Sequence, residues 1–150
     1  MKEYQSKRNN PYYLPHDLYM QVIYAIRGYD RLKREREDIL TGNRSADDGM
    51  PKSPMPGDPV AEKATKLAAI SSKIDAIDRA IARVPQEYRQ GVLDNVMYRD
   101  RWPINPPAHP NTWKYWRRRF IYWTAGNLYG LERLYPRGKV KWYNKYSGIV

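Results

Sequence analysis

The sequence contains no cysteine, which excludes disulfide bonds, thiolate metal ligands and thiol catalysis. It has only two histidines, His16 and His109, and neither has companion ligands. Both are expected to be structural or solvent-exposed, so we predict no metal site and no cofactor. No apolar run approaches the ~20 residues that a membrane span needs, and no signal peptide is evident. We therefore expect a cytoplasmic protein that makes no membrane contact.

The sequence also lacks the residue patterns that are typical of enzymes. There is no paired-carboxylate motif, no glycine-rich phosphate loop and no Ser/His/Asp arrangement with supporting context. Asp47, Asp48 and Asp58 could bind a divalent ion in principle, but a loop pair and a helix cap are the simpler interpretation. We predict a protein that is not an enzyme and has no catalytic residues.

Acidic residues are scarce in the second part of the chain. The 150 residues carry a net charge of +11, and residues 85–150 hold 12 Lys or Arg against 4 Asp or Glu. All five tryptophans lie in the same part, namely Trp102, Trp113, Trp116, Trp123 and Trp142. A basic field concentrated on one segment favours a polyanionic partner.

Hydrophobic periodicity predicts a long helix from near Pro15 to about Leu40. Its apolar stripe consists of Leu18, Val22, Ala25, Tyr29, Leu32 and Ile39. Gly28 weakens this helix by up to ~1 kcal/mol relative to alanine, but the periodicity favours one continuous helix. Residues 1–14 are expected to be a flexible N-terminus, and the Gly- and Pro-rich residues 41–57 a mobile loop.

A second helix is predicted from Asp58-Pro59 to Val84, with the clearest periodicity in the chain. Its heptad positions are Val60, Leu67, Ile74 and Ile81 in one register and Ile70, Ile77 and Val84 in the other. Two long amphipathic helices joined by one loop bury their stripes against each other, so we expect an antiparallel helical hairpin over residues 15–84. The alternative is a homodimer in which the heptad face of residues 60–84 meets a second copy of the chain.

The basic second part of the chain is predicted to form two shorter helices separated by a stiff turn. Residues 86–99 have helical periodicity, whereas four prolines within residues 102–110 exclude a helix there. The last helix is expected to begin at Asn111 or Thr112 and to end near Gly130. On a helical wheel, one face carries Trp113, Trp116, Phe120, Trp123, Asn127 and Leu131. The opposite face carries Lys114, Arg117, Arg118 and Ile121, flanked by Tyr115 and Tyr122. We expect the aromatic face to be core and the basic face to be exposed.

This basic face is the main candidate site. Phosphates need positive charge or N–H donors, and base edges need planar donors such as Arg or the amide of Asn. The candidate DNA-binding residues are Asn111, Thr112, Lys114, Tyr115, Arg117, Arg118, Arg119 and, in the basic aromatic tail 132–150, Lys139 and Lys141. We expect Arg117 and Arg118 at base edges, and Lys114, Arg119 and the tail cations at phosphates. The alternatives are a solvated helix face and a solubilising tail.

Three stretches of the chain occur in an order and spacing that suggest a known family. They are Gly49-Met50-Pro51-Lys52 followed by Asp58-Pro59 and Lys63-Ala64-Thr65-Lys66-Leu67; Val84-Pro85-Gln86-Glu87-Tyr88-Arg89; and Arg118-Arg119-Phe120-Ile121-Tyr122 with Ala125, Asn127, Leu128 and Leu131. Over most of residues 15–131 the chain resembles small phage-encoded transcriptional regulators of the RinA/ArpU type. The resemblance implies a module like region 4 of sigma factors, with residues 85–131 as a helix-turn-helix-like DNA-binding unit. One departure is that residues 103–110 stand where the related pattern has a short helix.

The sequence as a whole predicts an all-α protein, with a long antiparallel helical hairpin followed by a C-terminal helix-turn-helix-like unit. The predicted function is sequence-specific binding of double-stranded DNA by a transcriptional regulator of a phage or prophage, in the cytoplasm of the bacterial host cell. One alternative is a small-terminase-like DNA-packaging protein that forms a ring through its heptad face. Another is a module that binds no DNA and docks on RNA polymerase or a phage protein.

Overall fold

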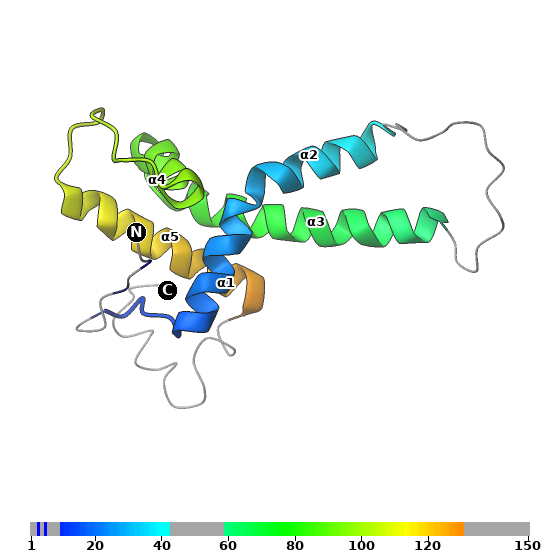
Figure 1. Ribbon diagram of the computed structural model, residues 1–150, viewed down its shortest axis with the longest axis horizontal. Helices are drawn as coiled ribbons and strands as arrows, with labels where there is room; N and C mark the ends of the chain where they lie inside the picture. Colours follow the sequence, from blue (N-terminus) through cyan, green and yellow to red (C-terminus); the bar gives the residue numbers. More distant parts are fainter. Residues whose placement is uncertain (1–2, 4, 6–9, 43–58, 131–150) are drawn as a thin grey trace.

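The computed structural model describes residues 3, 5, 10–42 and 59–130, and their regular secondary structure is helical throughout. The helices are α1 (His16–Arg27), α2 (Tyr29–Leu40), α3 (Pro59–Ala82), α4 (Gln86–Tyr98) and α5 (Pro110–Tyr129). Figure 1 shows a body that contains α1, α4 and α5, from which α2 and the first part of α3 project as an arm. The predicted all-α class is confirmed for the described residues.

Some of the sequence predictions fall outside the described part of the chain. The tail 132–150, with Lys139 and Lys141, is not described, and neither is residue 131 at the end of the aromatic stripe. The predicted loop 41–57 is described only at its first two residues. Among the helices that are described, none combines the length and the apolar character that a membrane span requires.

The helix expected from Pro15 to Leu40 is divided at Gly28, which corrects the prediction of one continuous helix. Gly28 has φ −82° and ψ 1°, and the chain changes direction there (Figure 1). α1 packs against α4 and α5, whereas α2 packs against α3. A straight helix could follow only one of these surfaces, so a bend at a residue of low helix propensity allows both halves to be buried.

The bend also changes which residues of α1 enter the core. Its buried residues are Tyr19, Val22, Ile23 and Ile26. Leu18 and Ala25, which the predicted stripe included, are only half-buried. A stripe drawn for one straight helix is wrong for α1 because α1 and α2 face different neighbours.

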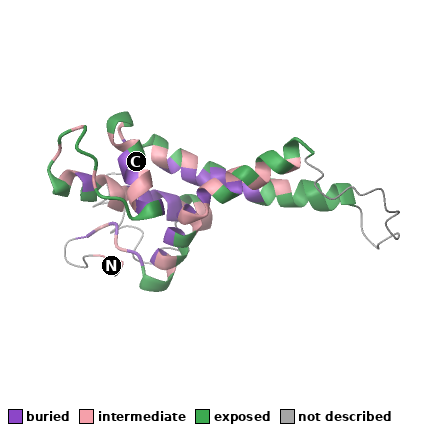
Figure 2. Cartoon of the chain, turned by 45° about the horizontal axis from the view of Figure 1, so that its top comes forward, coloured by how far each residue is buried: buried purple, intermediate pink, exposed green. Residues whose placement is uncertain are grey.

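α2 and α3 lie side by side and run in opposite directions (Figure 1). The buried heptad residues of this pair are Ile70, Ile74, Ile77 and Val84. Leu67 and Ile81 are half-buried, and Val60 is 74% exposed near the tip of the arm. Figure 2 shows the same gradient, with buried residues near the body and exposed ones along the outer part of α3. The homodimer through residues 60–84 stays a prediction.

A polar contact joins α2 to α3 near the body. The Tyr29 hydroxyl donates a hydrogen bond to the Asp78 carboxylate. Burial, reinforced by this carboxylate, raises the pKa of Tyr29 above its ordinary value. Farther along the arm, Lys66 Nζ lies 3.7 Å from Glu35 Oε1, an exposed ion pair that contributes little to stability.

The second half of α5 is the centre of the core. Its buried residues are consecutive, namely Phe120, Ile121, Tyr122, Trp123, Thr124 and Ala125. α5 contacts α1, α3 and α4, and Tyr12 packs edge-on against Tyr122 with 5.4 Å between ring centroids. The segment Phe120–Ala125 is buried on all sides and cannot present a groove-binding face, whereas the first half of α5 has exposed residues.

Candidate nucleic-acid interface

α5 begins at Pro110, one residue before Asn111, the earlier of the two predicted starts. His109 is the N-cap residue and Pro110 occupies the first helical position, where a missing N–H costs nothing. The His109 imidazole accepts a hydrogen bond at Nδ1 from the backbone N–H of Asn111, at 3.1 Å. His109 is exposed and has a structural role, as predicted, and this cap fixes the direction in which α5 starts.

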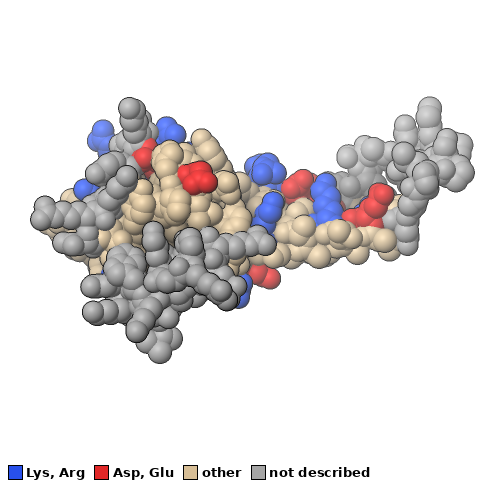
Figure 3. All heavy atoms as spheres, turned by 90° about the horizontal axis from the view of Figure 1, so that it is seen from below, with Lys and Arg blue, Asp and Glu red and all other residues tan. Residues whose placement is uncertain are grey.

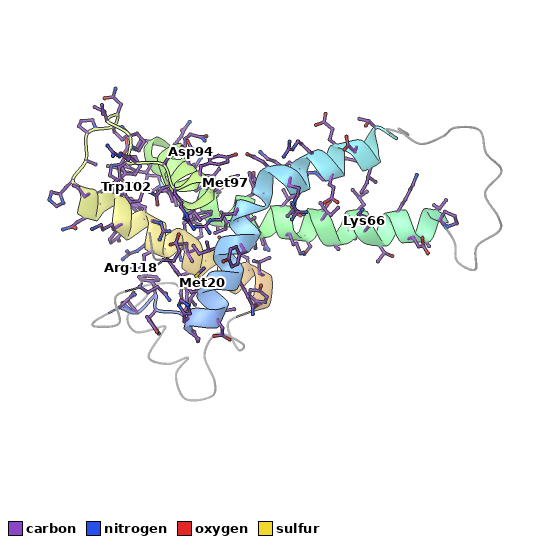
Figure 4. All side chains as sticks on the ribbon, in the orientation of Figure 1. Met20, Lys66, Asp94, Met97, Trp102 and Arg118 are labelled. Carbon is purple, nitrogen blue, oxygen red and sulfur yellow. The ribbon has the colours of Figure 1, made fainter. Side chains whose placement is uncertain are left out.

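The first half of α5 has one side open to solvent. Asn111, Lys114 and Tyr115 are exposed and Arg118 is half-buried. These four residues cover about a third of the helix circumference, and we refer to them as the open face of α5. Lys114 and Arg118 have no ion-pair or hydrogen-bond partner in the described part of the chain. Figure 4 shows Arg118 on the side of α5 that faces away from α4.

Arg117 does not belong to the open face, which corrects the prediction that it shares an exposed basic face with Arg118. Its guanidinium donates from Nε to Asn95 Oδ1 at 2.8 Å, from Nη1 to the Tyr19 hydroxyl at 2.9 Å and from Nη2 to Glu3 Oε2 at 2.9 Å. The side chain is only 18% exposed. Arg117 is therefore a residue that holds the body together rather than one that reaches outward.

Glu3 joins two arginines from different helices. Its Oε1 lies 2.7 Å from Arg27 Nη2 and its Oε2 lies 2.9 Å from Arg117 Nη2, with the Glu3 side chain 13% exposed. Arg27 Nε also donates to the backbone carbonyl of Val96 at 3.2 Å. Buried charges are tolerated only where they are paired and hydrogen-bonded, as they are here. This network ties α1, α4 and α5 to the N-terminal segment.

Arg119 lies between two tyrosine rings. Its Cζ is 4.4 Å from the centroid of Tyr12 and 3.1 Å from that of Tyr115. Nη1 also donates to the carbonyl of Tyr115 at 3.3 Å. Burial lowers the pKa of Arg119 below its ordinary value. The two rings and the Tyr115 carbonyl are close contacts of the Arg119 guanidinium, and a phosphate contact at Arg119 stays a prediction.

Two further residues of the predicted face are placed differently by the structure. Ile121 is 2% exposed, because the second half of α5 is surrounded by other elements. Thr112 is half-buried, and its backbone N–H donates to the carbonyl of His109 at 2.8 Å. On the aromatic face, Trp113, Phe120 and Trp123 are buried as predicted, while Trp116 is half-buried.

The connection between α4 and α5, residues 99–109, carries two further cations, Arg99 and Arg101. Arg99 and Arg101 are exposed and form no ion pair within the described residues. Neither is among the predicted DNA-binding residues, although residues 99–119 hold six Lys or Arg and a single acid, Asp100. Figure 3 shows Lys and Arg atoms at the end of the body opposite to the arm, with some acids among them.

This connection is longer than the turn of a helix-turn-helix motif. α4 ends at Tyr98, with Arg99 in the left-handed conformation (φ 60°), and α5 begins at Pro110. Helix-turn-helix motifs join their two helices with about three or four residues. α4 nevertheless packs directly against α5, so the two helices of the predicted unit are in contact despite the long connection.

The described residues contain no group of three or more His, Asp or Glu side chains that could hold a metal ion. His16 and His109 lie at the starts of α1 and α5. Comparisons of the chain with protein-family models, with curated proteins and with solved structures found no match.

Proposed function

We propose that this protein binds double-stranded DNA sequence-specifically, as a transcriptional regulator of a phage or prophage. The observation that supports this most directly is the open face of α5, where Lys114 and Arg118, beside Asn111, have no side-chain partner among the described residues. In helix-turn-helix proteins the N-terminal residues of the recognition helix reach the base edges, and here the N-terminal half is the open half. The resemblance to RinA/ArpU-type regulators points to the same function.

The side chains of this surface suit two kinds of contact. The Arg118 guanidinium matches the O6 and N7 acceptors of guanine, and the Asn111 amide matches the N6 and N7 atoms of adenine. Phosphate contacts, which position a protein without reading sequence, are assigned in this proposal to Lys114 and to Arg99 and Arg101 of the connection. In this proposal α4 and α5 act as a helix-turn-helix-like pair with an extended connection.

The proposal is tested by fluorescence anisotropy with duplex fragments of the source genome, compared with shuffled duplex over a salt series. The variant Lys114→Ala/Arg118→Ala is expected to bind a preferred fragment at least ~10-fold more weakly, because it loses one base contact and one phosphate contact. The slope of log affinity against log salt should fall by about one, because one phosphate contact is lost.

The matched control is Lys73→Ala/Arg79→Ala, which removes the same charges from exposed positions of α3. It is expected to retain the wild-type affinity and preference. Equal weakening by both double variants would show that only net charge matters, and the sequence-specific role of the open face would then be wrong. Negligible duplex binding by the wild type at low salt would reject DNA binding altogether.

A further inference from the structure

We propose that the connection between α4 and α5 is a wedge that inserts Ile104 between base pairs of the duplex and kinks it. This inference rests on the proposed duplex binding. Ile104 is 87% exposed, more than any other large hydrophobic side chain among the described residues. Figure 2 shows the connection as an exposed loop at the end of the body, beside the start of α5. Binding of a partner at this place would remove the apolar surface of Ile104 from water.

The base of the loop is held by rigid rings. Trp102 stacks on buried Trp113 with 5.6 Å between ring centroids and 9° between planes. The Pro103 ring packs so closely against Gly91 that a Cβ on that glycine would lie 2.7 Å from Pro103 Cγ. A side chain carried on a stiff support loses little conformational entropy when it binds.

A hydrogen-bond chain ties the same loop to the charge network of the body. Asn95 Nδ2 donates to the carbonyl of Asp100 at 2.7 Å, and Asn95 Oδ1 accepts from Arg117 Nε at 2.8 Å. The loop is thus fixed at Asp100 and Trp102, just before Ile104, and at the His109 cap after it. These contacts hold Ile104 away from the core instead of letting the loop collapse onto it.

The charges around Ile104 indicate which partner it meets. Arg99 and Arg101 precede it and Lys114 follows it, all exposed and without ion-pair partners in the described part of the chain. A duplex presents an apolar stack of bases between two rows of phosphates, which matches an apolar side chain flanked by cations. Isoleucine is among the residues that wedge between base steps and partly unstack them.

The test uses the fragment preferred in the anisotropy experiment, carrying a dye at each end for energy transfer. A second duplex series carries 2-aminopurine, whose emission rises when a base is unstacked, at successive positions. With the wild type we expect the ends to approach each other and one step to brighten, most readily at a flexible pyrimidine–purine step. Ile104→Ser should abolish both signals and bind about 10-fold more weakly. Ile104→Leu, which keeps an apolar wedge, should retain them.

Val60→Ser is the matched control, because it removes an exposed apolar side chain from the arm. It is expected to leave both signals and the affinity unchanged. If the wild type binds the fragment without kinking it, or Ile104→Ser kinks it fully, the wedge is wrong and the proposed function stands. If Ile104→Ser kinks the duplex fully, the exposed Ile104 would instead be a contact for a protein partner. If the wild type binds no duplex, the proposed function is wrong, and the wedge, which depends on duplex binding, is wrong as well.

Discussion

Arg117→Ala is expected to lower the free energy of unfolding by roughly 3 kcal/mol, the range measured when one member of a buried ion pair is removed. The substitution deletes the hydrogen bonds to Asn95, Tyr19 and Glu3. It also leaves the Glu3 carboxylate, 13% exposed, with Arg27 as its one remaining ion-pair partner among the described residues. Urea unfolding followed by far-ultraviolet circular dichroism measures the loss.

The neighbouring Arg118→Ala serves as the matched control. Arg118 has no partner within the described residues, so its removal should change stability by no more than about 0.5 kcal/mol. Arg117→Lys should not restore the stability, because a single ammonium cannot reproduce the planar fork that meets three partners. Equal losses of stability at the two positions would contradict the division of roles between Arg117 and Arg118.

Much of the helical structure could be predicted because its signals are local. The Asp58-Pro59 start and the Val84-Pro85 stop predicted α3 within two residues of Pro59–Ala82. α4 likewise ends one residue before the predicted position. The break at Gly28 could not be predicted, because it depends on two surfaces that exist only when α3, α4 and α5 have assembled. Helix propensity identified Gly28 as an unfavourable helix residue. It could not show whether the helix continues through Gly28 or bends there.

The exposure of the candidate site residues was predicted correctly only where α5 has solvent on one side. Lys114 and Tyr115 are exposed, as the wheel predicted. Arg117 lies four residues after Trp113 and so on the border of the aromatic face, where the wheel cannot decide its direction. Its decisive partner, Glu3, lies 114 positions away in the sequence. No local pattern reveals such a pairing, and the N-terminal residues 1–10, with three Lys or Arg and one acid, gave no reason to search for one.

Gly91→Ala is expected to destabilise the protein by roughly 3 kcal/mol, at the upper end for overpacking a core. A Cβ at this position would lie 2.6 Å from Trp113 Cζ3 and 2.7 Å from Pro103 Cγ. Both neighbours belong to rigid rings, and Trp113 is also stacked on Trp102. Alanine favours a helix by only about 1 kcal/mol over glycine, so the clash outweighs the gain. The displaced loop should also kink the duplex less, as energy transfer would report.

Gly28→Ala is the same substitution at a site where the structure has room. There the closest atom to the new Cβ is Arg31 Nη2 at 3.1 Å, the end of a flexible side chain, and the backbone oxygens lie at 3.5 Å or more. With φ at −82° the backbone suits alanine, so we expect stability to be unchanged or raised by up to ~1 kcal/mol. A loss at Gly28 as large as that at Gly91 would contradict the explanation of the Gly91 effect by crowding against Trp113 and Pro103. A loss confined to Gly91 would show that the space under the Trp102–Trp113 stack is what fixes the position of the connection.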